Sequence, residues 1–93
     1  MKNTITREKL ERYFSLTETA LKEAKKSIIK GMEKQAKEIV DMAENYLSDA
    51  RHFQKNSDFV NAFAAINYSH GWLDSGVRLG VFDVKNNKLF TVK

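Results

Sequence analysis

The stretch Ser27-Ile28-Ile29-Lys30-Gly31-Met32 decides how this chain of 93 residues folds. On both sides of it, apolar residues recur in steps of four and three, the spacing of a core-facing helix, but the phase slips around Gly31. We therefore predict two helices joined near residues 29–32, the first capped by Thr4 or Thr6. The stripes are Leu10, Phe14, Thr17, Leu21, Ala24 and Ile28, then Met32, Ala36, Ile39, Ala43, Tyr46, Ala50 and Phe53.

The alternative to this break is one continuous helix over residues 5–55. Such a helix would be a rod about 70 Å long, at 1.5 Å per residue. A single further helix could not cover the apolar stripe of that rod, so the alternative requires a dimer. The cost of leaving the stripe uncovered favours the break.

The segment Asn56-Ser57-Asp58 marks the next boundary, since asparagine suits a helix C-terminus and Ser57 or Asp58 can cap a new helix. Gly80 is placed to end that third helix in the left-handed conformation. The third helix is apolar around most of its circumference, so we expect it to lie between the other two. Its core stripe is Phe59, Ala62, Phe63, Ile66, His70, Leu73 and Val77, and its second apolar face is Ala65, Tyr68, Trp72 and Leu79.

The C-terminal residues follow a strand-like pattern. Residues 81–92 are typical of two short strands around an Asn86-Asn87 turn, and an extended apolar tail is the alternative. An isolated hairpin is marginal in water, so either form should lie against the helices. The prediction is an all-α fold in one domain, residues 1–93. It is an antiparallel three-helix bundle (helices at about 5–29, 32–55 and 58–79) with a short C-terminal extended segment or β-hairpin, 81–93, packed on it.

The composition excludes several classes of protein. With no cysteine, the chain has no disulfide scaffold, thiol nucleophile or thiolate metal site. The longest apolar run, Ala62 to Ile66, is far shorter than the roughly 20 residues that span a bilayer. The first residues, 1–4, lead into a charged stretch without the apolar core of a signal peptide. We expect a cytoplasmic protein with no membrane contact and no cofactor.

The run Tyr68-Ser69-His70-Gly71-Trp72-Leu73-Asp74-Ser75-Gly76-Val77-Arg78-Leu79-Gly80 fits the pattern Tyr-x-His-Gly-x-Leu-Asp-x-Gly-x-x-Leu-Gly throughout. Together with a tyrosine-containing helix at 43–53 and an aromatic, alanine-rich stretch at 58–66, it resembles the short archaeal proteins catalogued as domain of unknown function 357. The resemblance covers residues 43–84, and only helical character is shared before about residue 40. It implies a compact helical fold and an archaeal origin, and it implies no activity.

Polar residues of that run form a candidate functional cluster. His70 and Asp74 are four residues apart, so the carboxylate could orient the imidazole, and Arg78 repeats the spacing. Asp49 and His52 form a similar couple, and an antiparallel hairpin could bring the two couples together as ligands for zinc or another divalent metal. No named metal motif is present, so a structural hydrogen-bonded network is the stronger prediction, and no catalytic residue is assigned. The cluster is Tyr68, His70, Trp72, Asp74 and Arg78.

The glycines of the same run are unusual in a helix, where each costs about 1 kcal/mol relative to alanine. They lie near a stripe of small residues at helical spacing, which favours close approach of another helix. The alternative is that a ligand or partner chain uses the same gap. The predicted helix-packing glycines are Gly71, Gly76 and Gly80.

Positive charge is concentrated in the first part of the chain. Residues 1–40 carry 10 Lys or Arg and 6 Asp or Glu, which accounts for the whole net charge of +4. Lysines there follow steps of four and three along one side of a helix, as in nucleic-acid binders. The same lysines can form ion pairs one turn away, and no aromatic residue is interleaved for base stacking. The basic face is Lys22, Lys26, Lys30, Lys34 and Lys37.

These patterns favour a protein-interaction or self-associating module that binds a protein partner, or a second copy, through the third helix and the tail. The tail matters because Phe82 and Phe90 are core residues if it packs and an apolar patch if it does not. The second hypothesis is a nucleic-acid-associated protein that uses the basic 22–37 face. The third is a metal-binding protein or enzyme that uses His70 and Asp74.

Overall fold

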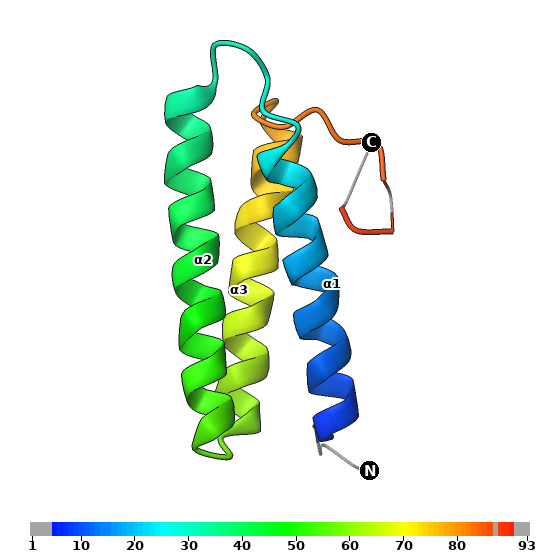
Figure 1. Ribbon diagram of the computed structural model, residues 1–93, viewed down its shortest axis with the longest axis vertical. Helices are drawn as coiled ribbons and strands as arrows, with labels where there is room; N and C mark the ends of the chain where they lie inside the picture. Colours follow the sequence, from blue (N-terminus) through cyan, green and yellow to red (C-terminus); the bar gives the residue numbers. More distant parts are fainter. Residues whose placement is uncertain (1–4, 87, 91–93) are drawn as a thin grey trace.

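The computed structural model describes residues 5–86 and 88–90 and shows three helices packed side by side (Figure 1). Helix α1 spans Arg7–Lys25, α2 spans Glu33–Lys55 and α3 spans Phe59–Arg78. The chain runs up α1, down α2 and up α3, and α3 packs against both other helices, most extensively against α2. The predicted all-α, antiparallel three-helix bundle is therefore confirmed.

Local chemistry explains where the helices begin. The Thr6 hydroxyl accepts a hydrogen bond from the backbone N–H of Lys9 at 3.1 Å, which caps α1. The Asp58 carboxylate accepts one from the Asn61 N–H at 3.2 Å and caps α3. Between α1 and α2, Gly31 has φ of +94°, a conformation that side chains disfavour. The chain therefore turns at Gly31, as the phase slip predicts.

Helix α1 ends at Lys25 rather than at residue 29, because the residues after it pair with the C-terminal tail. Ile28 forms an isolated antiparallel bridge with Phe82. The Ile29 N–H donates to the Val81 carbonyl at 2.9 Å, and the Asp83 N–H donates to the Ser27 carbonyl at 2.7 Å. A helical conformation at 27–29 would remove these bonds, and Ile28, predicted in the core stripe, is instead 38% exposed.

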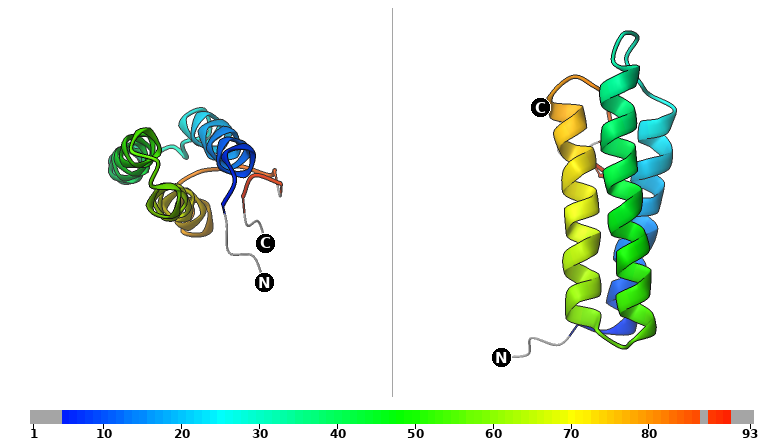
Figure 2. Two further views of the ribbon diagram at one scale, coloured as in Figure 1. Left: turned by 90° about the horizontal axis from the view of Figure 1, so that it is seen from below. Right: turned by 90° about the vertical axis from the view of Figure 1, so that its left-hand side faces the viewer.

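The tail does not form the predicted hairpin within the described residues. The Val81 N–H bonds back to the Gly76 carbonyl at 2.8 Å, and Gly80 takes φ of +79°, which together end α3. Beyond Val81 the tail pairs with the α1–α2 connection and then follows α1 (Figure 2). Asn87 of the expected turn and residues 91–93 of the expected second strand lie outside the described residues.

Small side chains on α1 and α2 make room for this tail. In the half of the bundle nearest the α1–α2 connection, both helices present mainly alanine to the interior. Alanine cannot fill the space between three helices, and interiors are close-packed. The apolar side chains of the tail fill it. The buried cluster consists of Ala20, Ala24, Ala36, Ile39, Ala43 and Leu73 from the helices and Val81, Phe82, Val84, Leu89 and Phe90 from the tail.

In the other half, the helices close the core themselves, because Leu10, Phe14, Leu47 and Ile66 fill the space beside Ala50, Ala62 and Ala65. There Arg51 of α2 lies over the ring of Phe14, 3.6 Å from its centre, and pairs with Glu11 at 3.2 Å. A hydrogen bond from Gln54 lowers the pKa of Glu11, and the Arg51 guanidinium lowers it further against the opposing effect of burial. Glu11 is therefore ionised at neutral pH and joins α1 to α2.

Of the three predicted helix-packing glycines, Gly76 alone lies against a neighbouring segment. A Cβ at position 76 would lie 2.7 Å from Cδ2 of Phe82 and 3.0 Å from Cδ1 of Ile39. The prediction for Gly71 is wrong, because no heavy atom of the described residues comes within 4 Å of the place a Cβ would occupy. Gly80 likewise has open space and serves the left-handed turn after α3.

We expect Gly76→Ala to destabilise the fold by about 1–2 kcal/mol, because the overlap with Phe82 outweighs the gain in helix propensity. Gly71→Ala is the matched control in the same helix and should stabilise it, by up to about 1 kcal/mol. Urea denaturation followed by circular dichroism measures both. Equal effects of the two substitutions would contradict the packing of the tail on α3.

Candidate functional site

The outer face of α3 carries large apolar side chains that the fold leaves exposed. Val60 is 66% exposed, Tyr68 63% and Trp72 38%, and Leu79, directly after the helix, is 75% exposed. Steps of four and seven place Tyr68, Trp72 and Leu79 on one side of the helix, and Val60, eight residues before Tyr68, lies at the edge of that side. Residues 59–78 contain two Asp, Glu, Lys or Arg side chains, Asp74 and Arg78, and the exposed Arg78 follows Val60 by five helical turns and so lies at the same edge. The outer face is therefore mainly apolar and carries a single charge, that of Arg78.

Two shallow hollows mark this face. One, of about 330 Å³, lies over Gly71 between Tyr68 and Trp72, and it exists because glycine leaves that space empty. The other, of about 160 Å³, lies between α2 and α3, where the Tyr46 and Tyr68 rings are 5.4 Å apart. Asp49 lines the second hollow. Side chains of a partner could enter either one.

His70 joins three segments of the molecule. Its Nε2 lies 2.5 Å from the carbonyl oxygen of Leu89 in the tail, and its Nδ1 lies 3.0 Å from the hydroxyl oxygen of Thr17 in α1. A carbonyl only accepts, so Nε2 carries a proton and donates it, and in the neutral ring Nδ1 accepts from Thr17. Both nitrogens are thus occupied by structural bonds, which leaves the ring poorly suited to bind a metal or transfer protons.

The structure separates the two predicted metal-binding couples. His70 and Asp74 line a hollow of about 240 Å³ between α1 and α3. Asp49 lines the hollow beside Tyr46 instead, and the exposed His52 lies 3.4 Å from the Asn56 amide nitrogen near the end of α2. Across the described chain, no three His, Asp or Glu side chains are grouped so that they could hold a metal ion.

The predicted basic face is divided by the break in the chain. Lys22 lies in α1, Lys26 directly after it and Lys30 in the connection, whereas Lys34 and Lys37 lie in α2. The five lysines therefore do not follow one side of a single helix. Lys37 pairs with Asp41 at 2.9 Å, which raises its pKa. Nucleic-acid binding stays a prediction, with less support than the continuous stripe would give.

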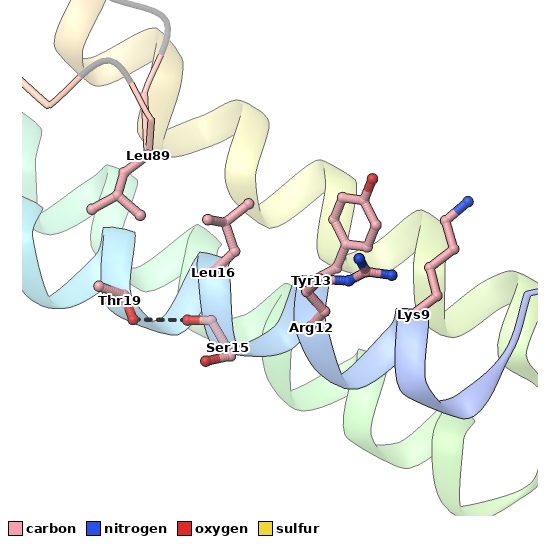
Figure 3. Close-up of a pocket in the computed structure, with 7 residues that line it drawn as sticks. All are labelled: Lys9, Arg12, Tyr13, Ser15, Leu16, Thr19 and Leu89. Carbon is pink, nitrogen blue, oxygen red and sulfur yellow. Dashed lines mark hydrogen bonds between the residues drawn. The ribbon is translucent and has the colours of Figure 1, made fainter.

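A further hollow in the described structure was not predicted. It lies over the outer side of α1, has a volume of about 600 Å³ and is shown in Figure 3. The sequence signal for it was the presence of Tyr13 and Leu16 outside the core stripe of α1. Leu89 lines the hollow only because of the path of the tail, and the spacing of apolar residues in the sequence does not reveal that path. The lining residues are Lys9, Arg12, Tyr13, Ser15, Leu16, Thr19 and Leu89.

The fold and its surface define a small all-α protein whose distinguishing features are a mainly apolar helix face and a shallow groove. A family model described as "Protein of unknown function (DUF357)" matches residues 12–82. The chain belongs to this family, as the run at 68–80 indicated, and the archaeal origin stays a prediction. No curated protein and no solved structure matches the chain. No helix among the described residues is both long and apolar enough to cross a membrane.

We expect Thr17→Val to destabilise the protein by about 1–2 kcal/mol, because it removes the hydroxyl that bonds His70 in a buried setting. Thr19→Val is the control, since Thr19 is exposed and its hydroxyl bonds only the Ser15 carbonyl of its own helix. That change should stay within about 0.5 kcal/mol. Urea unfolding gives both values, and a Thr17→Val effect as small as that of the control would rule out a structural role for the His70 bond.

Proposed function

We propose that this protein is a protein-interaction module whose docking surface is the outer face of α3. The observation that carries the proposal is the exposure of Val60, Tyr68, Trp72 and Leu79 on a face whose single charge is that of Arg78. Charged residues make up 30% of the chain, so a solvent-facing helix side with one is unusual. Depletion of charge and enrichment of Tyr and Trp are the compositional marks of interface cores.

The shape of this face supports the same function. Tyr68 and Trp72 stand one helical turn apart with the Gly71 hollow between them. Rigid aromatic side chains next to a cavity give an apolar segment of a partner a surface to pack on and a space for one of its side chains. Covering them with a partner would stabilise the complex by about 25 cal/mol for each Å² of apolar surface removed from water. We place this function in the cytoplasm, because the chain has no cysteine for an oxidising compartment to pair.

The test is affinity capture from lysate of the native host, with and without nuclease, using three baits. Tyr68→Glu puts a charge in the middle of the face, and Gln35→Glu puts the same charge on an exposed position of α2. We expect a protein partner that survives nuclease and binds the wild type and Gln35→Glu alike. Its recovery with Tyr68→Glu should fall roughly tenfold or more.

Equal recovery with the two variants would disprove the role of this face, and recovery of nucleic acid alone would disprove the function. Sedimentation equilibrium of the purified protein is run in parallel. A mass that rises with concentration, and does so less for Tyr68→Glu than for Gln35→Glu, would identify the partner as a second copy of the chain.

A further inference from the structure

The charged residues of α1 are sorted onto different sides of the helix. Glu11 and Glu18 turn toward α2, where they lie 3.2 and 3.5 Å from the Arg51 guanidinium. Lys9 and Arg12 instead line the groove over α1, where the Lys9 ammonium lies 5.6 Å from the centre of the Phe63 ring. Neither residue is in an ion pair among those of the described chain. The lining of the groove therefore carries two cations and no carboxylate.

Apolar side chains form the rest of the groove. Tyr13 and Leu16 come from α1, and Leu89 of the tail lies beside them because His70 holds its carbonyl (Figure 3). Leu16 remains 36% exposed even though the tail packs nearby. The groove thus combines an incompletely covered apolar floor with uncompensated positive charge.

The dimensions of the groove suit a short peptide segment. Its lining extends along α1 from Lys9 to Thr19, about 15 Å at 1.5 Å per residue. An extended segment of about five residues spans this length. The volume of about 600 Å³ is within the range of ligand-binding clefts.

We propose that the groove over α1 binds an acidic segment of a partner protein that carries apolar side chains. The apolar side chains rest on Tyr13, Leu16 and Leu89, and carboxylates on either side pair with Lys9 and Arg12. The inference rests on the proposed function and deepens it, because it states the chemistry of the partner. A second copy fits less well, since the net charge of +4 repels it. A nucleic acid in the groove would form only two phosphate contacts, with Lys9 and Arg12, and the rest of its backbone would lie against apolar leucine side chains.

The direct test uses a fluorescein-labelled peptide in which leucine and phenylalanine alternate with glutamate. Its counterpart has lysine in place of every glutamate. The fluorescence anisotropy of each labelled peptide is measured as the full chain is added. The acidic peptide should bind, with an affinity that falls as the salt concentration rises, and the basic peptide should not bind. Amide chemical shifts in the ¹⁵N spectrum should change most around Tyr13, Leu16 and Leu89.

Two double variants separate the groove from general charge. Lys9→Glu/Arg12→Glu reverses the groove cations, and Lys22→Glu/Lys26→Glu makes the same change in net charge at two exposed sites, one in α1 and one directly after it. We expect the first to weaken binding roughly tenfold and the second by no more than about twofold. Leu16→Ala, at a partly exposed position, should also weaken binding and leave the thermal midpoint unchanged.

Equal losses for the two double variants, binding of the basic peptide, or shifts confined to α3 would overturn the proposal. Phosphatidylserine vesicles and oligothymidylate are titrated in the same way. Tighter binding of either, lost in Lys9→Glu/Arg12→Glu, would assign the groove to that ligand instead. The two proposals can fail separately: a captured partner sensitive to Tyr68→Glu but not to Lys9→Glu/Arg12→Glu would support the α3 surface and overturn the groove.

Discussion

The packing of the tail on an alanine-lined interior is the interaction on which the rest of this structure depends. Close to the α1–α2 connection, the helices contribute mainly alanine, with Ile39 and Leu73, to the shared core. A bundle of these helices alone would hold a large void, and voids cost free energy in proportion to their volume. Phe82 and its neighbours remove that void, so the tail is a part of the core and not an appendage.

Several local features follow from this packing. A glycine is needed at position 76 because the Phe82 ring occupies the space of a side chain. Helix α1 stops at Lys25 because the next residues hydrogen-bond the backbone of the tail. His70 faces inward because its ring links the Leu89 carbonyl to Thr17. The conspicuous residues of the run at 68–80 are thereby divided, with Gly76 and His70 serving the fold and Tyr68 and Trp72 left on the surface.

The helices were predictable because each depends on local chemistry. The four-and-three spacing, the caps Thr6 and Asp58, and Gly31 all act within one or two turns, so the sequence shows them directly. The path of the tail depends on contacts with residues about fifty positions earlier, such as Ile28 with Phe82. Periodicity contains no information about such pairs. For the same reason the site was predicted in part: Tyr68 and Trp72 were identified, and the groove under Leu89 was not.

The exposed apolar face of α3 is not required by the fold, which is complete without covering it. Within the described residues, no buried polar side-chain atom lacks a hydrogen-bond partner. Both core clusters are closed, one by large helix side chains and the other by the tail. Covering Tyr68 or Leu79 would thus add nothing that the isolated fold requires. Exposed apolar side chains promote aggregation, and their grouping on one side of α3 is the basis of the docking surface proposed above. The α1 groove differs in having two cations beside its apolar floor, so the two proposed surfaces would suit partners of different charge.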